Sequence, residues 1–184
     1  MAYLRCKRLN FNIVLLVFSV VAGVFSGIFR LRFFSEADVA LLAAGLHQFV
    51  AEFNSAAIGW AAFAESLLRY GRPLVLIWAC AAIPKAYYAA FLVVYLRALT
   101  LGFSAALMVV AFDGRGFVMA LALYAVQNLI AMPMYGYTIY FMAKNPLAPN
   151  TVKHAVKVAV MGVLAVSAAV IIEIYITPIL FDLL

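Results

Sequence analysis

Long apolar runs, separated by short polar stretches, set the pattern of this chain. The first run covers residues 11–29 and has basic residues on both sides. About 19 apolar residues are enough for a helix to cross roughly 30 Å of hydrocarbon. A secretory signal peptide has a shorter apolar core and a small-residue cleavage site before polar sequence. The pattern therefore predicts a helix that stays in the membrane.

The apolar stretch 73–112 is too long for one membrane-spanning helix and short for two. Arg97 interrupts it, and we predict a turn there, with tilt, bilayer thinning or a re-entrant path absorbing the short second half. Asp113-Gly114-Arg115-Gly116 has the composition of a second turn. The predicted spans are 11–29, 73–96, 98–112, 117–142 and 158–176.

Residues 31–72 form the most polar stretch of the chain. Ser35 to Asp38 reads as a helix start, with a capping residue and acids in the first turn. Apolar residues follow at helical spacing, and a second amphipathic piece covers 63–70. Two interpretations are open: helices packed on the rest of the protein, or helices lying in the membrane interface.

Composition agrees with a membrane protein. The 184 residues are 69% hydrophobic and 11% charged, whereas soluble domains are nearer half apolar and a quarter charged. We predict an all-α, polytopic transmembrane helical bundle of about five spans. It would form a single membrane domain over 1–184, with 31–72 as an extracytoplasmic helical segment. The net charge of +6 comes from residues flanking apolar runs, which indicates topology and not nucleic-acid binding.

The basic residues also predict the orientation, because they collect in the cytoplasmic loops of membrane proteins. One cluster precedes the first span and another lies in the loop before the last, and five spans place both inside. Arg30 and Arg32 argue weakly for the opposite orientation. We therefore predict a multi-pass protein of the cell membrane with a cytoplasmic N-terminus and an extracytoplasmic C-terminus. The two clusters are Arg5, Lys7 and Arg8, and Lys144, Lys153 and Lys157.

Side chains for covalent chemistry are scarce. The two histidines, His47 and His154, fall in loops on opposite sides of the predicted membrane, and no predicted span contains one. A serine–histidine dyad within the bilayer is therefore not available. Cys6 and Cys80 are far apart in unlike contexts, which favours two packing thiols. We expect no catalytic residue, no metal site and no cofactor.

Lys85 and Glu173 are the ionisable residues most expected inside spans, and each needs a partner or water there. Their depths differ, so a direct pair is disfavoured. We expect Glu173 to bond a neighbouring helix near the outer surface, with a transport path as the alternative. Gln127 and Asn128, just before Pro133, are expected to hydrogen-bond between helices or to backbone groups freed by the proline.

Small residues recur every fourth position in the first span, at Ser19, Gly23 and Gly27. Such a face lets two helix backbones approach closely. It predicts either packing within the chain or a homodimer.

Three segments together resemble the stage II sporulation protein M family. They are Phe63 to Arg69 leading through Trp78 to Arg97 and Gly102, Gln127 to Ile130 closing on Pro133, and Glu173 to Tyr175 closing on Pro178. The predicted spans, orientation and length are also similar. The chain departs from the family pattern at Lys85 and at Arg69-Tyr70-Gly71, where the family has a polar asparagine.

The resemblance implies a role in the engulfment step of endospore formation. The family member is a membrane scaffold that localises two peptidoglycan hydrolases, the stage II sporulation proteins D and P, and is not itself the catalyst. A scaffold needs a surface that its partners can reach, and 31–72 is the only sizeable extracytoplasmic segment. We nominate Glu36, Asp38, Glu52 and Arg69 as part of that surface. The alternative function is a small transporter or permease subunit.

Overall fold

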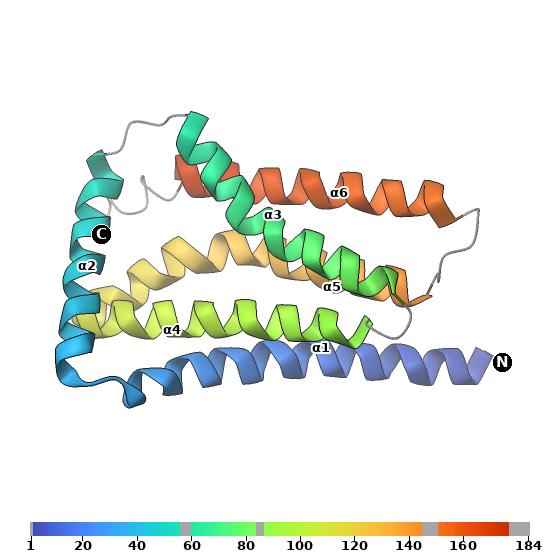
Figure 1. Ribbon diagram of the computed structural model, residues 1–184, viewed down its shortest axis with the longest axis horizontal. Helices are drawn as coiled ribbons and strands as arrows, with labels where there is room; N and C mark the ends of the chain where they lie inside the picture. The colour runs from blue at the N-terminus through green and yellow to red at the C-terminus, as the bar shows by residue number, and fades with distance from the viewer. Residues whose placement is uncertain (1, 56–59, 84–86, 145–150, 177–184) are drawn as a thin grey trace.

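A computed structural model describes residues 2–55, 60–83, 87–144 and 151–176, and all regular structure in these ranges is helical (Figure 1). This confirms the predicted all-α class. Within these described ranges, three segments are long and apolar enough to cross a membrane by length and composition: Asn12–Phe33, Tyr88–Tyr124 and Val156–Tyr175. The elements are α1 (Ala2–Arg30), the 3-10 turn η1 (Leu31–Phe33), α2 (Glu36–Ser55), α3 (Trp60–Ala82), α4 (Tyr87–Ala120), the π-helical turn η2 (Leu121–Ala125), α5 (Val126–Lys144), α6 (Thr151–Ile171) and the π-helical turn η3 (Ile172–Ile176).

α1 lies along α4 with very close backbone contact (Figure 1). A Cβ atom added at Gly23 would lie 2.5 Å from the Tyr95 carbonyl oxygen, and one added at Gly27 would overlap the Leu99 carbonyl oxygen. Gly102 of α4 meets the backbone of α1 in the same way. The small-residue face predicted for close approach is therefore used within this chain. Ser19, on the same face, is buried, and its hydroxyl donates to the Leu15 carbonyl at 2.8 Å.

α4 consists of two arms that meet at a sharp break. Asp113 has φ 52° and ψ −135°, so the helix cannot continue through it, and the chain turns back there. Gly116 then lies directly against the backbone of Met108 and Val109, where a Cβ would collide. We call 87–112 the first arm and 114–120 the second. The predicted Asp113–Gly116 turn is confirmed.

The turn predicted at Arg97 is wrong. Arg97 lies inside the first arm of α4, and the break before this arm falls between Ala82 and Tyr87. A charged residue is tolerated within the helix because its guanidinium lies over the Tyr70 ring of α3, 4.9 Å from the ring centroid. The helices of this region are thus α3, which ends at Ala82, and the first arm, which contains Arg97, and of the two only the first arm belongs to a segment long and apolar enough to cross a membrane.

The polar stretch 31–72 is not one structural unit. It contains η1, α2 and the first half of α3, which runs without interruption from Trp60 through Pro73 to Ala82. The amphipathic piece at 63–70 is therefore the beginning of a long helix. Sequence patterning missed this because the charges of 65–72 hide the continuity between a polar first half and an apolar second half.

α2 stands across one end of the bundle, roughly perpendicular to α1 and α4 (Figure 1). Leu46 and Val50 pack into a small core with Met108 and neighbouring residues of α4, and the His47 ring lies 4.3 Å from the Phe112 ring, centroid to centroid. These contacts show that α2 packs on the rest of the protein, and a position in the membrane interface stays a prediction. Ser35 caps the helix, with its Oγ accepting from the Asp38 N–H at 3.2 Å.

A larger apolar core fills the space between α3, α4, α5 and α6. Its buried members are Tyr70, Leu74, Ile77, Ala90, Phe91, Val94, Ala131, Tyr135, Ile139, Val166 and Val170. Large aliphatic and aromatic side chains are also exposed along the outside of the helices, such as Phe18, Leu92 and Leu164 at 67%, 56% and 64%. An apolar surface of this extent suits a lipid solvent.

Candidate functional site

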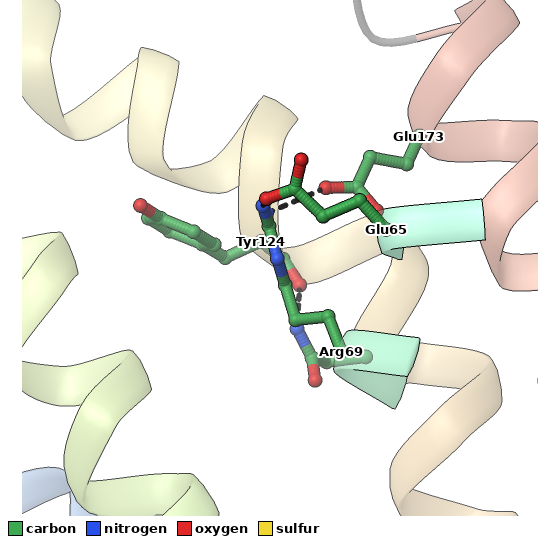
Figure 2. A network of polar contacts seen from close by, with 5 residues as sticks. Glu65, Arg69, Tyr124 and Glu173 are labelled. Carbon is green, nitrogen blue, oxygen red and sulfur yellow. Dashed lines mark hydrogen bonds and ion pairs between the residues drawn. The ribbon is translucent and has the colours of Figure 1, made fainter. Parts of the chain in front are cut away.

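The charged residues inside the bundle meet where α3 passes the end of α6. Arg69 of α3 donates from Nη1 to Oε1 of Glu173 at 3.1 Å, and its Nη2 lies 3.5 Å from Oε1 of Glu65 (Figure 2). The Glu173 side chain is 7% exposed, whereas that of Arg69 is 43% exposed. The carboxylate is thus held inside the protein by an arginine that reaches in from the surface.

Helical spacing explains why these groups converge. Glu65 and Arg69 are four residues apart, so both lie on one side of α3. Ser66 and Tyr70 are also four apart, on the adjoining buried side, and both neighbour the Glu173 carboxylate. Glu173 belongs to η3, the π-helical turn that ends α6. Such turns are frequent at functional sites because they redirect side chains.

A second cation extends the cluster toward α4 and α5. The Arg97 guanidinium lies over the Tyr70 ring, and the Tyr70 carbonyl accepts a hydrogen bond of 2.9 Å from the Tyr135 hydroxyl. Tyr70 and Tyr135 are 2% and 0% exposed. Three helices besides α6 therefore contribute polar groups to one buried site.

The cluster is incompletely satisfied within the described part of the chain. Oε2 of Glu173 and Nε of Arg97 are buried without a hydrogen-bond partner. An acceptor and a donor left in this state each cost about 1–3 kcal/mol unless water or a ligand group reaches them. The arrangement can hold water, a proton or a small polar group.

Beside the ion pair lies a second polar group on η2 and α5. Asn128 donates from Nδ2 to the Tyr124 carbonyl at 2.6 Å, and Gln127 is fully buried. The Tyr124 side chain extends away from the ion pair (Figure 2). Pro133, inside α5, is exposed. The acceptor lies four residues before Asn128 on the same helical stretch, so the predicted bonds between helices or to backbone groups freed by Pro133 stay a prediction.

The nominated partner surface is not one patch. Glu36 and Asp38 are exposed at the start of α2, whereas Arg69 belongs to the ion pair on α3. Glu52 lies in the last turn of α2, and its side chain is outside the described part of the chain. Lys85 and Pro178 also lie outside the described residues. Within the described ranges, no three His, Cys, Asp or Glu residues gather closely enough to hold a metal ion.

Sequence reasoning expected Glu173 to bond a neighbouring helix but did not find its partner. Arg69 was assigned to an outer surface, and Arg97 to a turn. The available signal was the spacing of Ser66, Arg69 and Tyr70, which places polar groups on two adjoining sides of one helix. Arg97 carried a second signal, because it is the only charge between Tyr87 and Phe112.

Comparisons with protein-family models, with curated proteins and with solved structures find no match for this chain.

Proposed function

We propose that this protein is a non-catalytic membrane scaffold whose α2 end holds peptidoglycan hydrolases, as the resemblance to the stage II sporulation protein M family implies. The observation that carries the proposal is the position of α2 across the end of the bundle. Leu46 and Val50 fix the helix to α4, so its opposite side forms a firm, accessible surface. Leu41, 74% exposed, and the exposed Ala44 and Gln48 lie on that side.

The distribution of charge supports an orientation with α2 outside the cytoplasm. The beginning of α1, the end of α5 and the beginning of α6 lie at the end of the bundle opposite α2 (Figure 1). Six basic residues lie there, whereas Glu36, Asp38 and Glu52 lie in α2 and are partly offset by Arg30, Arg32 and Arg115 at the same end. In this proposal α1, α3, the first arm of α4, the returning chain through α5, and α6 form the five crossings. The basic residues are Arg5, Lys7, Arg8, Lys144, Lys153 and Lys157.

Charge reversal at the start of α2 tests the docking surface. Glu36→Lys combined with Asp38→Lys is expected to reduce recovery of the stage II sporulation proteins D and P with the membrane-extracted protein at least about fivefold, because like charge at an interface is costly. Lys157→Glu, at the opposite end, is the matched control and is expected to leave recovery unchanged. Full recovery with the doubly reversed variant would reject the nomination.

Labelling of single cysteines in intact cells tests the orientation separately. In a background with Cys6 and Cys80 replaced by serine, an impermeant thiol reagent is expected to label Ser35→Cys. Lys153→Cys is expected to react only after the membrane is opened. The reverse pattern would overturn the orientation.

A second candidate, a small transporter subunit, draws on one observation: the buried carboxylate and guanidinium whose Oε2 and Nε atoms lack partners among the described residues. Buried charges between helices often mark ion paths. Flux through proteoliposomes that contain only this protein, abolished by Glu173→Gln, would favour transport. Equal leakage with the unaltered protein and with Glu173→Gln would leave the scaffold as the better proposal.

A further inference from the structure

One cation of α3 stands apart from the ion pair. Arg72 is exposed and has neither a hydrogen bond nor an ion pair with any described residue. One outward neighbour, Arg69, is held in the ion pair with Glu173. The others are apolar: Leu68, Val75 and Leu76 are 54%, 66% and 53% exposed. We call Arg72 and these three apolar residues the α3 face.

Contacts on the buried side of α3 fix the depth of this face. The Tyr70 carbonyl accepts a hydrogen bond from Tyr135, which lies equally far from the two ends of α5. The Tyr70 ring also contacts the guanidinium of Arg97, which is well inside the first arm of α4. That arm belongs to the segment Tyr88–Tyr124, which is apolar enough to cross a membrane. Arg72 follows Tyr70 by two residues, about 3 Å along the helix axis. The α3 face is therefore near the middle of the bundle.

A cation at this depth does not suit a lipid-facing surface. Charged residues in membrane spans almost always face a protein interior or water and have a partner. The aliphatic stem of an arginine lets the guanidinium reach toward the headgroups by only a few ångströms. Leu68, Val75 and Leu76, which surround Arg72 except on the side of Arg69, resemble instead the contact surface of one transmembrane helix with another.

We propose that the α3 face receives the transmembrane helix of a partner protein that carries a carboxylate near mid-membrane, and that Arg72 is the ion partner of this carboxylate. Charge complementarity supports this occupant. A second copy of this chain, related by a two-fold axis along the membrane normal, would place Arg72 against its own counterpart, which is repulsive. A lipid phosphate lies roughly 15 Å from the centre of the hydrocarbon. The inference does not depend on which proteins the α2 end holds, but it rests on the proposed function in one respect, the crossing of the membrane by α3.

Synthetic transmembrane peptides of polyleucine provide the probe. Full-length protein and a fluorescent peptide are reconstituted at pH 8 in phosphatidylcholine vesicles, and energy transfer between them is measured. A peptide with glutamate at its centre is expected to bind about tenfold more tightly than one with glutamine, the size found for polar pairing in model helices. Arg72→Gln is expected to remove this difference. Arg115→Gln, which changes an exposed arginine in the turn after Asp113, is the control and is expected to keep it.

A charge exchange makes the test specific. Arg72→Glu is expected to bind a peptide with central lysine and to lose its preference for the glutamate peptide. Thermal unfolding in detergent establishes that each variant is folded before binding is measured. Equal binding of the glutamate and glutamine peptides to the unaltered protein would overturn the proposal, as would a glutamate preference that survives Arg72→Gln.

Two further outcomes would assign the face to another occupant. If phosphatidylglycerol added to the vesicles competes with the peptide and abolishes its binding, Arg72 binds lipid phosphate. A change from dimer to monomer on Arg72→Gln, measured by photobleaching steps of labelled protein in vesicles, would assign the face to a second copy. Either result would overturn the proposal that the α3 face receives the helix of a partner protein.

Discussion

The contact of α1 with α4 and the contact of α3 with α6 hold two helices together in opposite ways. Between α1 and α4, glycines bring backbones together, and Gly27 and Gly102 leave no room for even one methyl group. Between α3 and α6, long side chains bridge the helices, with Arg69 and Glu173 joined at 3.1 Å. The first contact depends on shape alone and the second on charge.

The difference matters because lipid does not drive apolar helices together as water does. At a glycine contact the two helix backbones lie close enough for van der Waals attraction between them, and no added atom fits. A charged contact tolerates changes of shape but fails if one partner is removed, because the other is then buried alone. The first is therefore suited to a fixed framework, and the second to a place where water or a partner can be admitted.

Gly27→Ala is expected to have the largest effect on stability. The new methyl group would meet the Leu99 backbone, which cannot move without displacing α4, and we expect a loss of about 3 kcal/mol. Unfolding in a graded detergent mixture measures this loss. Gly71→Ala has open space around the added atom, so it is expected to be neutral or slightly stabilising. Equal loss for both variants would remove the distinction between the contacts.

Arg69→Leu is expected to come next, with a loss of about 2 kcal/mol, because the Glu173 carboxylate remains buried without a cation, and the exposed part of Arg69 keeps the loss below that of a fully buried pair. Arg69→Leu combined with Glu173→Leu is expected to recover more than half of the loss. The same unfolding assay, arranged as a double-mutant cycle, measures the coupling. Additive losses would mean that the two residues act independently.

Tyr135→Phe is expected to cost about 1 kcal/mol by removing the hydrogen bond to the Tyr70 carbonyl while keeping the ring in place. Tyr137→Phe, at a position that is 42% exposed, is the control and is expected to change stability little. If the two variants unfold alike, the bond at the centre of the cluster contributes nothing.

Ser35→Ala is expected to have the smallest effect, about 0.5–1 kcal/mol, confined to the beginning of α2. It removes the cap on the Asp38 N–H without touching either helix contact. Hydrogen exchange is expected to accelerate in the first turn of α2 and to stay unchanged in α1, with Glu36→Gln as control. Acceleration throughout the bundle would mean that α2 supports the whole fold.

Patterning predicted the elements whose cause is local. The apolar run 11–29 lies within α1, and the turn at Asp113 follows from an acid and two glycines in four residues. Patterning failed where the cause is a distant side chain. Arg97 looked like the end of a membrane-spanning helix because no residue near it in sequence offers its guanidinium a partner. Its partner is the ring of Tyr70, which lies on another helix. Spacing along one helix also cannot tell which residue of another helix will meet Glu173.

The fold-back at Asp113 has a consequence for how the protein enters a membrane. The helical stretch Tyr88–Tyr124, extended at about 1.5 Å per residue, would be nearly twice as long as hydrocarbon is thick, so it cannot enter as one rod. It must enter as a hairpin, with the two sides pressed together where Gly116 meets Met108. The tip carries Asp113 and Arg115, whose opposite charges cancel. In the proposed orientation this tip is what crosses the bilayer, and it does so without moving net charge against the membrane potential.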